Sequence, residues 1–421
     1  MYVALCDVHG MYSSVEAAFR PDLSDNGIAV ASNGDGIVVA LNSRAKQIGL
    51  KKFESVASQR GFFDSGQCTL FSSNYTLYAS MSQRLNQCLR NTGVFADQQE
   101  YSIDESFGLF PACINSYQDL LDCARQLRRA AWRETRLPIG VGVGQSFTLS
   151  KAASFLGKKG TGYRGIAVLT PDNEDALLSK IPVDEVWNVG RATALLLKRK
   201  SVNTALDLKR VAPKDARNWM GVCLERTVRE LRGEKIFDMN SFPTVENRKE
   251  VSSSISLTAR ATTRLELHQA LSERISIAAE KLRKQKLTAR HLTLFAQSDR
   301  FKEDYQSFYS NSSFEYPTDD TRLFIGALTK QFDQLYKDGV AYYKVGCRLL
   351  GIEGAENQQQ DLFAPAQCSK LMGVMDALNT KFGTRVVGIG SQRVDSDAKM
   401  LRKHLSPNYL TEWADIPTIR C

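Results

Sequence analysis

Two stretches of the 421-residue chain carry the same predicted order of elements, strand-helix-strand-strand-helix-strand, and this repetition limits the folds open to it. The first stretch spans residues 2–172, with residues 28–73 inserted in it, and the second spans 248–352. In the first, "MYVALCD" and "LPIGVGVG" predict apolar strands, and "SYQDLLDCARQLRRAAWRET" has the spacing of an amphipathic helix. Because this is the order of a ferredoxin-like unit, the predicted fold class is α+β.

The remaining stretches predict a hairpin, a helical module and a tail. The inserted residues open with "IAVASNGDGIVVAL", two β-rich runs on either side of an Asn-Gly-Asp-Gly turn, which predicts a hairpin. Residues 173–240 hold no convincing strand pattern and predict a module of short helices with glycine turns. Residues 353–421 begin with the polar "EGAENQQQDLF" and predict a mostly helical tail, more appendage than domain.

Charge and cysteine usage exclude some classes of protein. A formal net charge of +9 suits a polyanionic partner, although a basic chain need not bind nucleic acid. The nine cysteines are scattered singly, without the Cys-x-x-Cys spacing of a zinc site, and are too sparse for a disulfide framework. The chain has no run of about 18 apolar residues and begins without a basic signal region, so we expect a cytoplasmic protein that does not enter a membrane.

Three carboxylates are expected to converge in the first unit. Asp7 closes an apolar strand, and "SIDE" places Asp104 and Glu105 on or near the hairpin that lies beside it. A cluster of acids raises its own pKa values and needs cations, and oxygen ligands without histidine suit Mg²⁺ or Mn²⁺. Neighbouring strand residues point to opposite faces, so Asp104 and Glu105 share a metal only where the strand bends. The alternative is a helix cap at Asp7 and an exposed turn at the other two.

The helical stretch contains a second candidate site. Residues 183–208 have the shape of a helix-hairpin-helix, with a turn at Asn188-Val189-Gly190 and a basic helix that starts at Arg191. Backbone N–H groups at a helix amino terminus bind a phosphate without reading the base. The alternative is an ordinary helical hairpin in which Gly190 only permits a tight turn.

Two further sequences favour DNA and protein partners. The run "KLRKQKLTAR" predicts a track along a duplex backbone, although a solvated helix face is the commonest outcome for such a run. Its basic residues are Lys281, Arg283, Lys284, Lys286 and Arg290. "QQDLF" predicts a linear motif whose Gln359, Leu362 and Phe363 bind a partner's hydrophobic groove, and a chance apolar pair in a linker is the alternative.

Taken together, these residues resemble the Y-family translesion DNA polymerases. The resemblance runs nearly end to end and rests on motifs that are specific in combination. They are "DVHGMY", "FRPDL", "SNGDG", "SSNYTLYASMS", "YSIDES", "GVGVGQSFTLSKAA", "LERTVRELRGE", "QQDLF" and "LSPNYLTEWAD".

The resemblance implies a right-hand polymerase with five parts. The palm, a ferredoxin-like unit, is residues 1–27 and 74–172, with small fingers at 28–73. A helix-hairpin-helix thumb follows at 173–240. The remaining parts are a DNA-binding little finger at 245–352 and a C-terminal tail at 353–421 with a sliding-clamp motif at 359–363.

The resemblance also implies roles for single residues. Asp7, Asp104 and Glu105 correspond to the family's catalytic metal ligands, with the backbone carbonyl of Val8, and they hold two Mg²⁺ ions or Mn²⁺. Tyr12 occupies the steric-gate position beneath the sugar of the incoming nucleotide. The family's other contacts with the nucleotide correspond to Ser43, Lys46 and Lys151.

The chain departs from the family pattern around the nucleotide. Between the acid and the gate stand His9, Gly10 and Met11, and we expect Gly10 to loosen this turn. Four positions where relatives often have aromatic or basic side chains differ here: Leu41, Ser43, Lys46 and Phe147. Since each desolvated phosphate contact is worth about 1 kcal/mol or more, we expect weaker nucleotide binding and slow catalysis.

The function implied is error-prone translesion synthesis, the addition of deoxynucleotides to a primer 3′-hydroxyl in the SOS response. Its partners are primer–template DNA, a deoxynucleoside triphosphate, the sliding clamp and, by resemblance, a UmuD′-like dimer and RecA. The protein associates with the nucleoid when engaged. The alternative is a weakly active or non-catalytic subunit that binds primer termini and the clamp and slows replication or recombination. A nucleotide cyclase with a related palm explains only the carboxylates.

Overall fold

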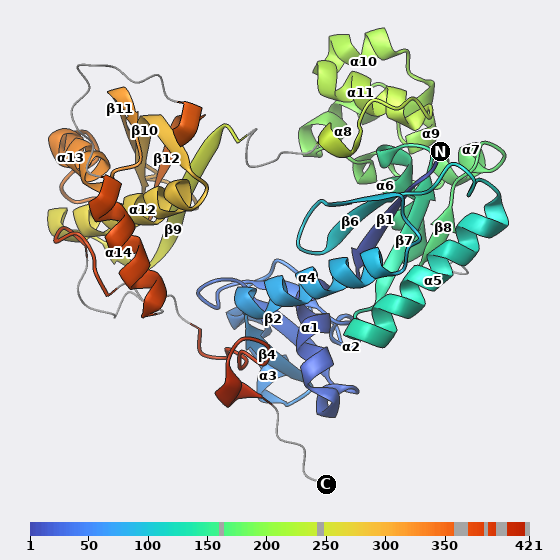
Figure 1. Cartoon of the computed structure of the whole chain (residues 1–421), viewed down its shortest axis with the longest axis horizontal. Helices are drawn as coiled ribbons and strands as arrows, with labels where there is room; N and C mark the ends of the chain where they lie inside the picture. The colour runs from blue at the N-terminus through green and yellow to red at the C-terminus, as the bar shows by residue number, and fades with distance from the viewer. Residues whose placement is uncertain (160–163, 242–247, 358–368, 383–385, 393–401, 417–421) are drawn as a thin grey trace. The chain divides into compact units, whose positions relative to one another are not determined.

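The computed structural model describes residues 1–159, 164–241, 248–357, 369–382, 386–392 and 402–416 (Figure 1). The chain divides into two compact units. One is Met1–Phe242 together with Arg402–Cys421, and the other is Pro243–Leu401. Within the described residues, none of the helices has the length and apolar character needed to span a membrane.

The first unit is built on a five-stranded sheet in the order β5-β6-β1-β7-β8. Its strands are β1 (Val3–Val8), β5 (Asp97–Glu100), β6 (Glu105–Leu109), β7 (Ile139–Gly144) and β8 (Ile166–Val168). The helices that belong to it are α1 (Met11–Phe19), α4 (Tyr75–Asn91), α5 (Tyr117–Thr135) and α6 (Phe147–Lys159). The first four strands and two connecting helices have the predicted ferredoxin-like order, and that prediction is confirmed.

Alternation along β1 decides what each face of this sheet meets. Ala4, Cys6 and Val8 pack into the core that α4 and α5 share. Val3 and Leu5 pack in a second cluster with residues of β6 and the start of α6. Since alternate residues of a strand share a face, the residue that follows Leu5 on the second face is Asp7, which therefore points toward α6.

The inserted segment forms its own three-stranded sheet, in the order β3-β2-β4. The strands are β2 (Gly27–Ala31), β3 (Val38–Leu41) and β4 (Cys68–Ser72), with helices α2 (Ser43–Gln47) and α3 (Arg60–Asp64). β2 and β3 pair antiparallel, which confirms the predicted hairpin. Its turn uses left-handed backbone at Gly34 (φ 84°) and Asp35 (φ 53°).

The middle of the chain is helical, as predicted. It contains α7 (Glu174–Leu178), α8 (Arg191–Arg199), α9 (Ala205–Arg210), α10 (Pro213–Met220) and α11 (Val222–Leu231). Their apolar faces share one core with α6 and β8. The turn before α8 takes its left-handed residue at Asn188 (φ 66°), while Gly190 is the N-cap of α8 with an ordinary φ of −81°.

The second unit is a four-stranded antiparallel sheet in the order β11-β10-β12-β9. Its strands are β9 (Glu250–Ala261), β10 (Leu287–Gln297), β11 (Ser307–Thr318) and β12 (Tyr342–Gly354). The helices are α12 (Arg264–Lys284), α13 (Thr321–Gln331) and α14 (Ser369–Lys381). The predicted strand-helix-strand-strand-helix-strand order is confirmed here too.

The tail differs from the expected appendage, because its described parts are packed on both units. In the second unit, the guanidinium of Arg283 on α12 forms two hydrogen bonds with the carboxylate of Asp376 on α14, at 2.7 and 2.8 Å. The same guanidinium donates to the Asp319 carbonyl and the Thr321 hydroxyl. Only 8% of the Arg283 side chain is exposed, so a helix of the tail is anchored by a buried charge pair.

Replacing Arg283 with methionine is expected to release α14. Removing one partner of a buried ion pair typically costs about 3–5 kcal/mol, because the other charge is left without compensation. Hydrogen exchange measured by mass spectrometry should show faster exchange of the α14 amides. The control is Lys284→Met, which breaks an exposed pair with Glu280 and should leave α14 as protected as in the wild type. Equal protection of α14 in both variants would contradict the anchoring role.

Candidate active site

The backbone brings the three predicted acids to one end of the sheet. Asp7 on β1 is the direct cross-strand partner of Glu105 on β6. The Val8 amide donates a hydrogen bond to the Asp104 carbonyl at 2.9 Å. Asp104 lies in the bend that precedes β6, so the strict alternation of strand residues does not separate it from Glu105.

Two lysines of α6 meet these acids. The Lys151 ammonium donates to both Glu105 oxygens, at 2.9 and 3.1 Å. The Lys158 ammonium forms a short contact with Oδ2 of Asp7. Asp104 instead accepts a hydrogen bond from the Ser102 hydroxyl at 2.5 Å. Lys151 and Lys158 are seven residues apart, two helical turns, so they share one face of α6, a spacing that could have identified Lys158 from the sequence.

The electrostatics of Asp7 follow from its depth. Burial raises its pKa from 3.8 to about 6, and the negative charges of Glu105 and Asp104 act in the same direction. Lys158 opposes this rise through its charge and its hydrogen bond. Burial and the neighbouring acids therefore favour the protonated form of Asp7, and Lys158 favours its charged form.

The donor set fits a hard divalent cation, although the side chains are not gathered around one point. Among the described residues, no three acidic, histidine or cysteine side chains are close enough to hold a metal ion as they stand. Asp7 and Glu105 each turn to a lysine, and Asp104 turns to Ser102. Oxygen-only carboxylate donors suit Mg²⁺ or Mn²⁺, and an ion bound by all three would take the place of the lysines as their counter-charge.

Lys151 is confined by aromatic rings. Its ammonium lies 4.4 Å from the ring centroid of Tyr101, 5.5 Å from that of Trp187 and 5.7 Å from that of Phe107. Only 14% of its side chain is exposed, against 39% for Lys158. This cage directs Lys151 at Glu105. Lys158 has more freedom to change partner.

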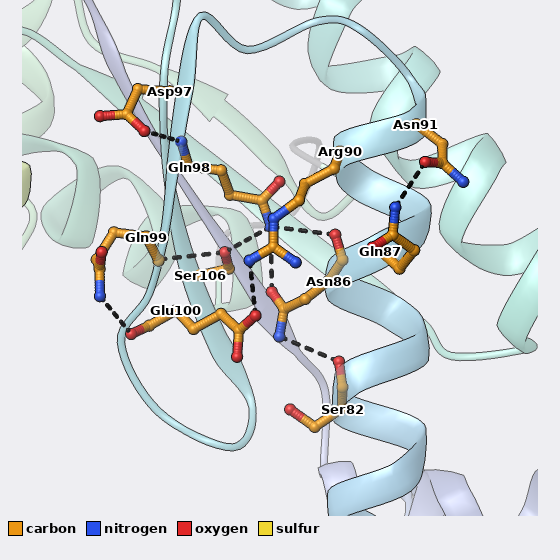
Figure 2. A network of polar contacts seen from close by, with 10 residues as sticks. All are labelled: Ser82, Asn86, Gln87, Arg90, Asn91, Asp97, Gln98, Gln99, Glu100 and Ser106. Carbon is orange, nitrogen blue, oxygen red and sulfur yellow. Dashed lines mark hydrogen bonds and ion pairs between the residues drawn. The ribbon is translucent and has the colours of Figure 1, made fainter.

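A polar network braces the acidic hairpin against α4 (Figure 2). Arg90 of α4 pairs with Glu100 of β5 at 2.7 Å. The Gln98 side chain donates to Asn86 of α4 at 3.2 Å and to the Ser106 hydroxyl at 3.1 Å. Because Ser106 directly follows Glu105 on β6, these bonds fix the strand that carries the acid.

Tyr12, the predicted gate, stands at the start of α1 between two other tyrosines. Its ring is stacked on Tyr78 with centroids 4.6 Å apart and meets the edge of Tyr75 at 5.7 Å. Gly10 before it adopts φ +60°, and a Cβ there would lie 3.1 Å from the Leu41 carbonyl oxygen. This left-handed, crowded turn favours a glycine, and the loosening expected at Gly10 stays a prediction.

The other predicted nucleotide-binding positions lie on α2. Ser43 and Lys46 are both exposed. Burial lowers the pKa of His9 to about 4, and the positive charges of Lys158, Arg128 and Lys46 add to this effect. Lys46 is thus close enough for its charge to act on the turn between Asp7 and Tyr12.

The predicted DNA-binding positions differ in exposure. Gly190 and Arg191 are exposed at the start of α8, with open space where a Cβ of Gly190 would stand. Lys281, Lys284 and Lys286 are exposed, and Arg290 is half-buried. Arg283 is buried against α14, so its charge is not available to a duplex. The candidate clamp motif, Gln359 to Phe363, lies outside the described residues.

Comparison with known proteins gives independent evidence of the family that this chain resembles. The impB/mucB/samB family model matches residues 6–155, and the model of that family's C-terminal domain matches residues 248–362. A third model, a domain of unknown function (DUF4113), matches residues 369–419.

Two curated relatives span the whole chain. Protein MucB of Salmonella typhimurium is 37% identical, with 98% of this chain and 98% of that protein covered. Protein UmuC of Salmonella typhimurium strain LT2 is 36% identical, with 99% of this chain and 100% of that protein covered. Among solved structures, a Y-family DNA polymerase chimera of Dbh and Dpo4 has a similar fold, with a TM-score of 0.66 and 17% identity over 84% of this chain and 99% of that one.

Replacing Asp7 with asparagine is expected to stabilise the metal-free protein near neutral pH. Because the folded-state pKa is raised from 3.8 to about 6, the carboxylate costs stability above pH 6 and costs none below 3.8. The gain is on the order of 1–3 kcal/mol at about pH 8 and fades as the pH falls from 6 toward 4. Thermal unfolding of both proteins with a chelator present, measured across this pH range, gives the difference in stability. Exposed Asp97→Asn is the control, and a loss of stability in Asp7→Asn at every pH would contradict the account.

Proposed function

Because this chain belongs to the impB/mucB/samB family, a group of Y-family DNA polymerases, we propose that it extends primers past damaged template bases. The observation that carries the proposal is the meeting of Asp7, Asp104 and Glu105 at one end of the first sheet, opposite two lysines. The reaction is template-directed nucleotidyl transfer, in which the primer 3′-hydroxyl attacks the α-phosphate of a deoxynucleoside triphosphate.

The proposed site depends on acids that bind cations and on a lysine that orients one of these acids. Two Mg²⁺ ions, when bound, supply activation of the attacking hydroxyl and stabilisation of the leaving pyrophosphate. Asp7, Asp104 and Glu105, with the Val8 carbonyl, would hold them. Lys151 stays in its aromatic cage and orients Glu105.

Lys158 is the residue that would change partner. In the metal-free protein it neutralises Asp7, and a cation on that carboxylate would free its ammonium. A half-exposed ammonium next to the site is suited to bind the triphosphate oxygens. This gives Lys158 the phosphate-binding role that the resemblance assigns to Lys151, and Ser43 and Lys46 of the exposed α2 would add contacts from the fingers.

The proposed domain roles follow the resemblance. Residues 1–27 and 74–172 act as the palm, 28–73 as the fingers, 173–240 as the thumb and 245–352 as the little finger. Small fingers close loosely over the nascent base pair, which favours low fidelity. Tyr12 excludes ribonucleotides by contact with the sugar.

Duplex DNA would be held through its backbone. The α8 amino terminus at Gly190 and Arg191 offers N–H donors and a positive charge to a phosphate. The exposed or half-exposed basic residues that would contribute from the second unit are Lys281, Lys284, Lys286 and Arg290. The same proposal includes binding of the sliding clamp through Gln359, Leu362 and Phe363. It also includes action in the SOS response, with a UmuD′-like dimer and RecA as partners.

A second candidate, a weakly active or non-catalytic subunit that occupies primer ends, is favoured by two buried side chains. Leu41 and Phe147 stand where relatives often have cations, and each is only 3% exposed in an apolar core. Neither side chain can supply a positive charge to the nucleotide. Turnover with primer–template, nucleotide and partner proteins distinguishes the two, because the second candidate predicts binding without extension.

Replacing Asp104 with alanine should abolish extension past an abasic site in the presence of Mg²⁺. Loss of a metal-holding carboxylate removes several kcal/mol of transition-state stabilisation, which is about 100-fold or more in kcat/KM. The control is Asp97→Ala, an exposed acid on the same hairpin, which should keep wild-type extension. Wild-type activity in Asp104→Ala would refute the assigned site.

Replacing Tyr12 with alanine should admit ribonucleotides. The ratio of ribonucleotide to deoxyribonucleotide kcat/KM is expected to rise by about 10-fold or more, since the ring no longer blocks the 2′-hydroxyl. Tyr12→Phe keeps the ring and should keep the wild-type ratio. An unchanged ratio in Tyr12→Ala would remove the gate role.

A further inference from the structure

The C-terminal segment of residues 402–409 is docked on the first unit, more than 300 positions away from its contacts. The Ser72 amide at the end of β4 donates to the His404 carbonyl at 2.9 Å, and the His404 amide donates to the Ser72 hydroxyl at 3.0 Å. Ser72 and Leu405 form a parallel β-bridge. Figure 1 shows this red segment beside β4 and α3. The segment is therefore held at the end of β4 by a single β-bridge and by a bond to the Ser72 hydroxyl.

Asn74 fastens the segment to the beginning of α4. Its amide nitrogen donates to the Ser406 carbonyl at 3.0 Å and the Ser406 hydroxyl at 3.2 Å, while its amide oxygen accepts from the Leu77 amide at 3.2 Å. Asn74 is 3% exposed. One buried side chain thus caps α4 and binds the segment, so the docking and the start of α4 are fixed together.

A buried carboxylate joins the segment to the tyrosines of the site. Oε1 of Glu16 on α1 accepts from the Ser406 hydroxyl at 3.0 Å and from the Tyr78 hydroxyl at 2.6 Å. Glu16 and Tyr78 are fully buried, and Ser406 is 4% exposed. Both donors bind Oε1, and Oε2 is buried without a hydrogen-bond partner among the described residues, so loss of either donor would leave this costly carboxylate with still fewer hydrogen bonds.

One face of α1 carries the connection from the segment to the gate. Tyr12, Glu16 and Phe19 are four and three residues apart, which places them on the same face of the helix. Phe19 stacks on Tyr409 of the segment at 4.8 Å. Tyr12 stacks on Tyr78, the ring whose hydroxyl binds Glu16. The segment therefore contacts α1, the helix that carries Tyr12, and shares Glu16 with Tyr78.

We propose that the docked segment of residues 402–409 is a specificity element for the sugar of the incoming nucleotide. It acts through positioning residues: Ser406 and Tyr409 fix Glu16, Tyr78 and α1, and these hold the Tyr12 ring in place. Sugar exclusion needs the ring placed to within about half an ångström, a tolerance that a single stacked neighbour does not give unless that neighbour is fixed. The inference rests on the proposed gate role of Tyr12 and assigns a task to part of the chain matched by the domain of unknown function.

The test measures the ratio of ribonucleotide to deoxyribonucleotide kcat/KM in full-length variants. Ser406→Ala combined with Tyr409→Ala removes the hydroxyl donor and the stacked ring from the segment. Tyr78→Phe keeps the stacked ring beside Tyr12 and removes only the bond to Glu16. We expect each to raise the ratio by about fivefold, less than Tyr12→Ala does, because each loses support of the ring and not the ring itself.

Matched controls keep the result specific. Tyr409→Phe retains the stacking ring and should keep the wild-type ratio, and so should Trp413→Ala, because Trp413 is 90% exposed and lies after the segment. If the double variant melts at a lower temperature, Ser406→Ala alone remains decisive, because it is a small change that removes the segment's hydroxyl donor to Glu16. Hydrogen exchange at the start of α4 should rise in the double variant only.

The outcomes separate the inference from the function it rests on. If Tyr12→Ala raises the ratio while Tyr78→Phe and the double variant stay within about twofold of the wild type, the segment does not position the gate. If Tyr12→Ala itself changes nothing, the gate role fails, and the inference fails with it.

Discussion

The charge pairing between α6 and the acidic end of the sheet is the constraint on which the first unit depends. Asp7 and Glu105 are brought together by the register of β1 with β6, and burial raises the pKa of Asp7, so a neighbouring cation is needed to favour its charged form. Lys158 and Lys151 supply it in the metal-free protein. The same pairing sets the chemistry, because a site that attracts lysines through carboxylate oxygens also attracts hard divalent ions.

Two structural connections extend from this site to distant parts of the chain. Trp187, one residue before the turn that precedes α8, is one of the rings around Lys151, so the helical module borders the lysine that orients Glu105. On the other side, α1 leads from Tyr12 through Glu16 to Ser406 of the C-terminal segment. The three acids and Tyr12 are thus positioned partly by segments outside the sheet.

The elements and the acidic cluster could be predicted from the sequence, because strand alternation, helical spacing and element order are local signals. The contacts that decide the role of each side chain could not be predicted, because they join residues far apart in the sequence. Arg283 was predicted to be one member of a basic track along a duplex backbone, and its contact with Asp376, 93 residues later, could not be predicted from the sequence. Ser406 lies in a motif that was visible, but its carboxylate partner is 390 residues earlier. Lys158 was missed although it lies seven residues after Lys151, and the crowding at Gly10 could not be predicted because the Leu41 carbonyl that approaches it is distant in the sequence.

The central claim is that Asp7, Asp104 and Glu105 form a divalent-cation site that two lysines occupy when the cation is absent. The most direct measurement is the amount of Mn²⁺ bound, followed by the electron paramagnetic resonance signal of free Mn²⁺, with primer–template DNA and a non-hydrolysable deoxynucleotide present. The account predicts that the wild-type protein binds Mn²⁺ that excess Mg²⁺ displaces, and that Asp104→Asn loses at least one bound ion. Equal Mn²⁺ binding by the two proteins would contradict it.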